Sequence, residues 1–166
     1  SMMQPMGYPE KFIRTAGRRA FVHARKDAQA DFQSFFADCK FSLWWLPEVN
    51  NMCRVRVMGS RGKGEEMGAA TGVAGGLNLA FELGGPEGRS ESEVELMEAR
   101  KGQRTERVNF IAVTSPAYEN AFRFEVAHYR GFYLTFMPPT HLRVMAFADD
   151  EQPGIVDFML NDFAGM

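Results

Sequence analysis

The chain has 166 residues, of which 45% are hydrophobic and 24% charged, so it is long and apolar enough for one packed domain. Its formal charge of −2 provides no excess of lysine and arginine to neutralise phosphates, so we expect neither nucleic acid nor an anionic membrane as a partner. Two cysteines, Cys39 and Cys53, are too few for a disulfide scaffold or a structural zinc site, and we predict that both are free thiols.

The beginning of the chain is broken up by two prolines and a glycine and lacks the apolar run of a signal peptide. We predict that residues 1–10 form a flexible N-terminal segment, opening with a cloning scar at Ser1, and that residues 11–163 form a single domain. No stretch of about 20 apolar residues occurs, so we expect no insertion into a membrane. These features alone indicate a cytosolic protein.

Alternation of apolar and polar residues, typical of strands with one wet face, dominates the sequence. The clearest predicted strands are residues 53–58, 77–83, 93–96, 122–126 and 142–145. Apolar runs at 132–136 and 155–160 fit strands covered on both sides, and weaker candidates lie at 12–14, 19–23, 31–35, 67–73 and 108–113. Glycine and proline turns separate these segments. About twelve short strands predict an all-β domain, either a closed barrel or a sandwich.

The same alternation predicts which side chains fill the interior. On these strands the expected core residues are Leu79, Phe124, Phe132, Leu134 and Phe158. Truncation of such residues is expected to be strongly destabilising.

Two segments leave alternatives open. Residues 25–36 fit either an amphipathic helix or a strand followed by a loop. Residues 41–47 interrupt the alternation by placing Trp44 and Trp45 among four other apolar residues. This run is either a lid over one end of the barrel, since large aromatic residues are usually buried, or an exposed patch that anchors a partner, since tryptophan is enriched in binding hot spots.

The sequence contains no residue pattern typical of an enzyme. Its three histidines, His23, His128 and His141, lack the spacing of metal ligands, and no GxSxG nucleophile elbow occurs. The glycine-rich stretch 59–64 lacks the Lys-Ser/Thr ending of a phosphate-binding loop, so we interpret it as a hairpin loop. We therefore expect a binding protein that is not an enzyme and uses no metal or cofactor.

The order and spacing of the strands resemble those of the interleukin-1 family of cytokines, and within it the interleukin-18 branch. Residues 124–134, FEVAHYRGFYL, are similar to the family signature of Phe-Glu-Ser, a short link with an aromatic residue, two aromatics and an aliphatic, with Val126 in place of the serine. Residues 155–160 resemble the closing strand, and residues 12–14, 38–39 and 66–69 favour the interleukin-18 branch.

The resemblance implies a β-trefoil, in which six strands close a barrel and six more form three hairpins that cap one end. It also implies a monomeric cytokine that acts in immune and inflammatory responses through a heteromeric receptor of immunoglobulin-domain subunits, with a soluble binding protein as a further expected partner. Such cytokines are leaderless, so the expected location is extracellular, reached from the cytoplasm without a signal peptide.

Five receptor-binding residues are expected from the same resemblance. Arg14 and Met67 agree with the interleukin-18 branch, and Glu66 adjoins Met67 on the matching strand. Arg107 and His141 fall on positions that are acidic in the family. Because alternate residues of a strand face opposite sides, a core-facing residue 13 would leave Arg14 in water, where a receptor could reach it.

Two other classes of binding protein remain as alternatives. An intracellular β-trefoil adaptor or lectin-like module would share the fold and the lack of a leader. A lipocalin-like carrier is disfavoured, because about twelve strands exceed its eight-stranded cup.

Overall fold

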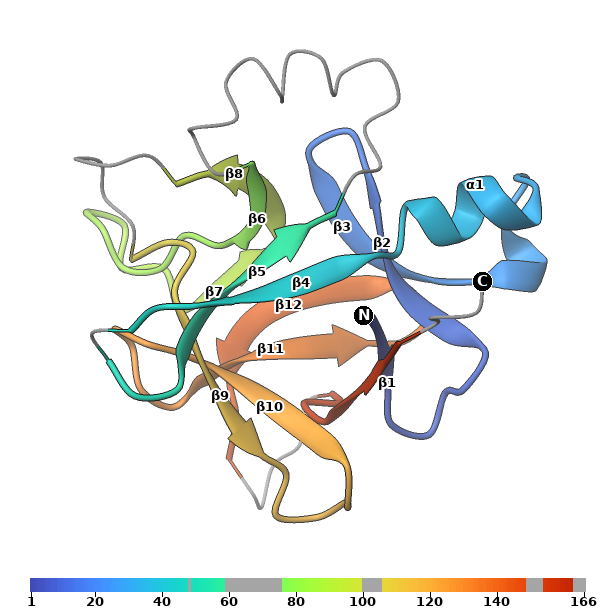
Figure 1. The fold of residues 1–166 in the computed structure, drawn as a ribbon. Coiled ribbons are helices and arrows are strands. Elements are labelled where there is room, and N and C mark those ends of the chain that lie inside the picture. Colours follow the sequence, from blue (N-terminus) through green and yellow to red (C-terminus); the bar gives the residue numbers. More distant parts are fainter. Residues whose placement is uncertain (48, 59–75, 100–105, 149–153, 163–166) are drawn as a thin grey trace.

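The computed structural model describes residues 1–47, 49–58, 76–99, 106–148 and 154–162 (Figure 1). Within these ranges the chain is almost entirely β-structure, which confirms the predicted fold class. The elements in chain order are β1 (Met2–Pro5), β2 (Lys11–Ala16), β3 (Arg19–Ala24), the 3-10 helix η1 (Arg25–Asp27), α1 (Phe32–Ala37), β4 (Phe41–Trp45), β5 (Met52–Val57), β6 (Leu77–Ala80), β7 (Glu91–Glu93), β8 (Glu95–Glu98), β9 (Phe110–Thr114), β10 (Ala121–Val126), β11 (Phe132–Met137), β12 (His141–Ala146) and β13 (Phe158–Asn161).

Six of the strands close into a ring. Antiparallel pairing runs from β1 to β13, from β13 to β10, and on through β9 and β5 to β4. The ring is completed where the amino group of Ser1 donates to the carbonyl of Phe41 at 2.8 Å and the Phe41 N–H donates back to Ser1 at 2.8 Å. A closed ring leaves few unpaired strand edges, which stabilises a barrel against intermolecular pairing.

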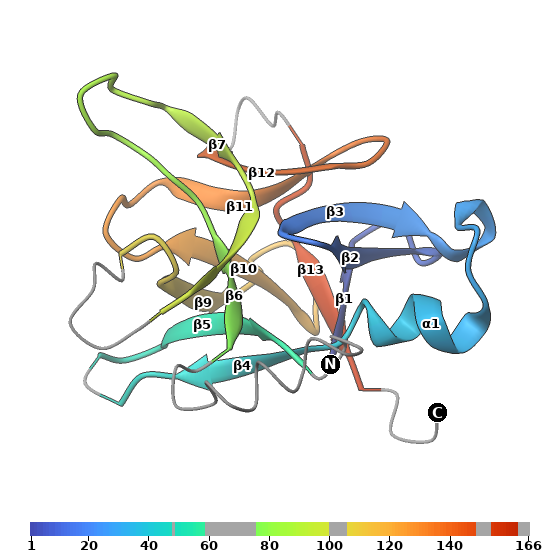
Figure 2. The same cartoon turned by 90° about the horizontal axis from the view of Figure 1, so that it is seen from above.

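Three antiparallel pairs lie outside this ring: β2–β3, β6–β8 and β11–β12. They correspond to the three capping hairpins that the family resemblance implied. The described residues contain thirteen strands. The predicted strand at 93–96 is divided at Val94 into β7, which pairs with β12, and β8, which pairs with β6. The hairpin β2–β3 and α1 lie together at one side of the barrel (Figures 1 and 2).

The first residues belong to the barrel. Met2 and Met3 are buried, and β1 pairs with β13 along its whole length, from Met2 opposite Asn161 to Pro5 opposite Phe158. The predicted domain boundary at residue 11 is therefore wrong. Little in the sequence indicates this strand, because its residues do not alternate and its proline, which lacks a ladder donor, stands at the strand end.

The interior is a phenylalanine-rich core inside the ring and beneath the hairpins. Rings of Phe81, Phe110, Phe124 and Phe158 form a chain of edge-to-face or tilted contacts, with centroids 5.2–6.5 Å apart. Of the five predicted core residues, Leu79, Phe124, Leu134 and Phe158 are fully buried. Phe132 is instead half-buried and packs against the edge of the core.

A second, smaller core lies under α1. Asp31 caps the helix by accepting a hydrogen bond from the Ser34 N–H at 2.8 Å, and this bond helps to hold the pKa of the Asp31 carboxyl below its usual value. Phe35 then points inward and packs on Phe12 of β2, together with Met2 and Cys39. The helical interpretation is thus correct over Phe32–Ala37, and the weak strand predicted at 31–35 is wrong. The strand predicted at 67–73 lies outside the described residues.

The buried position of Phe124 gives a direct test of the core. Phe124→Ala removes a ring with no exposed surface and should lower the free energy of unfolding by about 3–5 kcal/mol. The matched control is Phe32→Ala, because that ring is half exposed on α1, and it should cost less than about 1 kcal/mol. Urea unfolding of both variants measures the difference, and equal losses would contradict this assignment of the core.

Both cysteines are free and buried, as the sequence predicted. Burial raises the pKa of each thiol to about 12, so at pH 8 the reactive thiolate is almost absent from the folded protein. We expect a colorimetric disulfide reagent to react very slowly with native protein at pH 8 and to titrate two thiols after unfolding. Rapid native reaction, or an intact Cys39–Cys53 bond in non-reducing mass spectrometry, would show this assignment to be wrong.

Candidate protein-binding surface

Arg14 lies on the outer face of β2, but it does not face water. Its Nε and Nη2 atoms both donate to the Asp38 carboxylate, at 3.3 and 3.1 Å, and its guanidinium lies 5.0 Å from the centroid of the Phe35 ring. Only 15% of the side chain is exposed. The alternation correctly put Ile13 in the core and Arg14 on the opposite face, but α1 covers that face. The expectation that Arg14 is solvated is therefore wrong.

His23 is the residue that links Arg14 to the surface. Its Nδ1 atom lies 3.2 Å from Nη1 of Arg14, and its ring contacts Phe21 and Phe35 at centroid distances of 5.6 and 6.2 Å. Because a guanidinium only donates hydrogen bonds, Nδ1 must accept, and the ring proton then resides on Nε2. Among the described residues Nε2 has no partner, and it is not sealed from solvent.

A hollow of about 370 Å³ lies beside His23, where β3 meets β12. The Val22 N–H donates to the carbonyl of Thr140 at 2.8 Å and holds the two hairpins together there. Buried apolar side chains of Ala20, Val94 and Leu142 line the hollow, together with Arg19, His23, Glu93 and the predicted site residue His141. The structure thus connects two of the expected receptor residues, since Arg14 contacts His23 and both histidines line the same hollow.

The other expected receptor residues are not part of this arrangement. Arg107 precedes β9, donates from Nε to the Phe81 carbonyl at 3.1 Å and lines a different hollow beside Glu82 and Tyr129. Glu66 and Met67 lie outside the described residues. Nothing in the sequence pointed to His23, because the register that pairs Arg14 with Phe21 and Phe12 with His23 becomes known only when β2 and β3 are paired.

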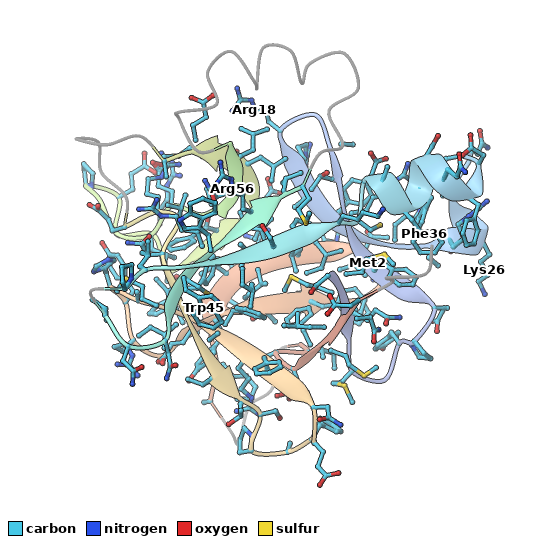
Figure 3. All side chains as sticks on the ribbon, viewed as in Figure 1. Met2, Arg18, Lys26, Phe36, Trp45 and Arg56 are labelled. Atoms are coloured by element: carbon cyan, nitrogen blue, oxygen red, sulfur yellow. The ribbon has the colours of Figure 1, made fainter. Side chains whose placement is uncertain are left out.

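The tryptophan run forms a regular strand, β4, and both tryptophans are exposed, by 52% and 53%. The interpretation of this run as a lid is therefore wrong. Trp44 pairs with Arg54 on the outer face of β4–β5 and carries the Arg56 guanidinium 4.2 Å from its ring centroid, whereas Trp45 pairs with Cys53 on the inner face. Figure 3 shows Trp45 and Arg56 on opposite sides of β4, so the two tryptophans do not form one continuous patch.

Two further observations concern the described part of the chain. It contains no group of three or more histidine, cysteine, aspartate or glutamate side chains placed to hold a metal ion. No helix in it has the length and apolar character needed to cross a membrane.

No protein-family model and no curated protein matches this sequence. Among solved structures, chicken interleukin-1 beta superposes with a TM-score of 0.59 at 15% identity, covering 97% of this chain and 94% of that one. A mutant of Gallus interleukin-1 beta gives 0.62 at 16% identity, covering 97% and 93%. The designed threefold-symmetric protein ThreeFoil gives 0.57 at 9% identity, covering 98% and 97%. The fold is a β-trefoil.

The β-trefoil confirms the predicted architecture of a six-stranded barrel capped by three hairpins. Identities of 9–16% show a shared fold, and function must be argued from the surface of this chain. On this β-trefoil, the β2–β3 hairpin with α1 and the β4–β5 hairpin carry the two surfaces described above.

The Arg14 contacts predict a stability effect that a solvated arginine would not have. Arg14→Ala leaves the Asp38 carboxylate and the Phe35 ring without their partner and should lower the free energy of unfolding by about 1–2 kcal/mol. Arg18→Ala is the matched control, since Arg18 is an exposed residue of the β2–β3 turn, and it should change stability by less than about 0.5 kcal/mol. Identical urea transitions for Arg14→Ala and the wild type would contradict the contacts.

Proposed function

We propose that this protein is a secreted cytokine of interleukin-18 type, which binds immunoglobulin-domain receptor subunits at the cell surface and acts in immune and inflammatory responses. The observation that carries the proposal is the structural match to interleukin-1 beta over nearly the full length of both chains. It agrees with the resemblance of residues 124–134 to the family signature.

The signature segment supports the proposal through the fold, because its residues build the β10–β11 turn. Glu125 accepts a hydrogen bond from the Gly131 N–H at 2.7 Å and pairs with Arg130 at 2.8 Å. Burial alone would raise the pKa of this carboxyl, but the Arg130 and Gly131 hydrogen bonds outweigh it and lower the pKa. These contacts give the signature residues a role in the fold, and we assign the receptor contacts to the surfaces of the hairpins.

A cytokine that joins two receptor subunits needs two separate contact surfaces, and we assign them to the two hairpin regions. One is the hollow lined by His23 and His141, where Arg14 contacts the Nδ1 atom of His23. The other is the outer face of β4–β5, where Arg56 lies over exposed Trp44. Tryptophan and arginine are the residue types that most often carry binding energy in protein interfaces.

Surface-immobilised ectodomains of interleukin-1-family receptor subunits provide the test. We expect one subunit to bind with nanomolar affinity and Trp44→Ala to weaken binding to one subunit by about tenfold. Tyr118→Ala is the control, because Tyr118 is equally exposed but lies in the turn between β9 and β10, and it should have no effect. Binding to a glycan array with no binding to any receptor subunit would instead support the lectin-like alternative.

A further inference from the structure

We propose that the open edge of β4 pairs with the same edge of a second copy of this chain, giving a weak dimer with twofold symmetry. In this dimer Leu43 lies opposite Trp45 of the second copy, and Trp44 lies opposite its own counterpart. The inference rests on strand register and side-chain exposure, and it does not depend on the proposed cytokine function.

The hydrogen bonds of β4 alternate between its two edges. The Leu46 N–H donates to the Met52 carbonyl at 2.9 Å, so in the register of the β4–β5 pair the even-numbered residues bond to β5. The odd-numbered residues therefore direct their backbone groups away from β5. Phe41 uses this side to exchange two hydrogen bonds with Ser1.

Leu43 and Trp45 are the remaining β4 residues on that side. Their N–H and C=O groups have no hydrogen-bond partner in the described part of the chain, which leaves an unpaired strand edge. The edge is short, because Ser1 fills the position beside Phe41 and Pro47 has no N–H to donate. An added strand must therefore pair with Leu43 and Trp45.

The sequence of β4 lacks the features that protect strand edges in monomeric proteins. Residues 41–46, FSLWWL, include neither a charged residue nor a proline. By contrast, the strands at the two ends of the main sheet order carry charges, with Lys11 in β2 and Glu91 and Glu93 in β7. Two β4 edges can thus approach each other without like-charge repulsion between their own side chains.

The exposure of the tryptophans favours strand addition over docking on one face. Trp44 and Trp45 are both more than half exposed, yet they lie on opposite faces of β4. A partner that packs on one face of the hairpin covers one of them. A strand added at the edge places side chains beside both.

A second copy fits because this edge is complementary to itself. If Leu43 lies opposite Trp45 of the second copy, twofold symmetry also places Trp45 opposite the second Leu43. Every unpaired N–H and C=O of these residues then has a partner. Trp44 faces its counterpart in the closer type of antiparallel pair, where aromatic side chains stabilise the pairing.

The neighbouring registers satisfy fewer backbone groups. Centring the pair on Leu43 brings Trp45 opposite Phe41, whose outer side is already bonded to Ser1. Centring it on Trp45 brings Leu43 opposite Pro47, which has no N–H. The register centred on Trp44 is therefore the one that uses the whole open edge.

Sedimentation equilibrium and amide exchange test the dimer. Between about 20 μM and 1 mM we expect a monomer–dimer equilibrium with a Kd of about 100 μM, since the shared edge is short. Amide exchange of Leu43 and Trp45 should slow several-fold over this range, whereas that of Trp44, already bonded to β5, should not. A monomer at every concentration, or a dimer that leaves both amides unchanged, would overturn the proposal.

Charge substitutions at position 44 test the register. Trp44→Lys and Trp44→Glu each place like charges across the twofold axis, so each variant alone should associate at least about tenfold more weakly than the wild type. An equimolar mixture should recover part of this loss by forming the mixed dimer. Tyr118→Lys is the matched control, because Tyr118 is a similarly exposed aromatic residue between β9 and β10, and it should dimerise normally. A mixture that associates no better than the separate variants would overturn the register.

The dimer and the cytokine function can fail separately. Self-association without binding to any receptor subunit would support the dimer and contradict the cytokine proposal. Receptor binding by a chain that stays monomeric at 1 mM would overturn the dimer and leave the cytokine proposal standing. Pairing of this edge with a strand of another protein, by a chain that is monomeric alone, would likewise overturn the second copy as the occupant.

Discussion

The candidate binding surface depends on the packing of the Phe35 ring between α1 and β2. This ring is fully buried between α1 and β2, and Phe12, Arg14 and His23 all contact it. Without α1 the outer face of the β2–β3 hairpin would be open to water, and Arg14 would have no reason to take a single conformation. With α1 in place, the guanidinium is fixed between Asp38 and the phenylalanine ring, and the orientation of His23 follows from that of Arg14.

This arrangement places a polar site on top of a rigid frame. The β2–β3 hairpin is joined to β12 through the Val22–Thr140 hydrogen bond, and its inner face contributes Ile13 and Val22 to the main core. Residues that line the hollow are therefore held by strands and not by long loops, which favours a preorganised site. The β4–β5 surface differs, because its exposed tryptophans lie near the end of a hairpin and on opposite faces of it.

The sequence predicted those strands whose own residues alternate between apolar and polar. Alternation identified most of the strands, including β5 and β12, because a strand with one buried face must alternate. It missed β1, whose four residues are all buried, since a strand covered on both sides and ending in proline shows no alternation. It also predicted a single strand at 93–96, because the division at Val94 is set by pairing with two different strands.

The candidate site was harder to predict because it consists of contacts between segments. Placing Arg14 opposite Ile13 required only the strand period, but its burial depends on a helix eighteen or more residues further along the chain. His23 has no local motif, and its role follows from strand register together with the hydrogen bond to Arg14. The exposure of Trp44 and Trp45 likewise depends on where the barrel ends, which their own sequence does not specify.

The tautomer of His23 is the property that tests this account most directly, and a long-range ¹H–¹⁵N correlation spectrum of its imidazole nitrogens measures it. We predict that the neutral imidazole of wild-type His23 carries its proton on Nε2, and that Arg14→Met gives an exchanging mixture of tautomers, because Arg14 is the partner of Nδ1 among the described residues. A wild-type spectrum showing the proton on Nδ1, or the same mixture with and without Arg14, would contradict the claim that Arg14 orients a hydrogen-bond donor toward the surface.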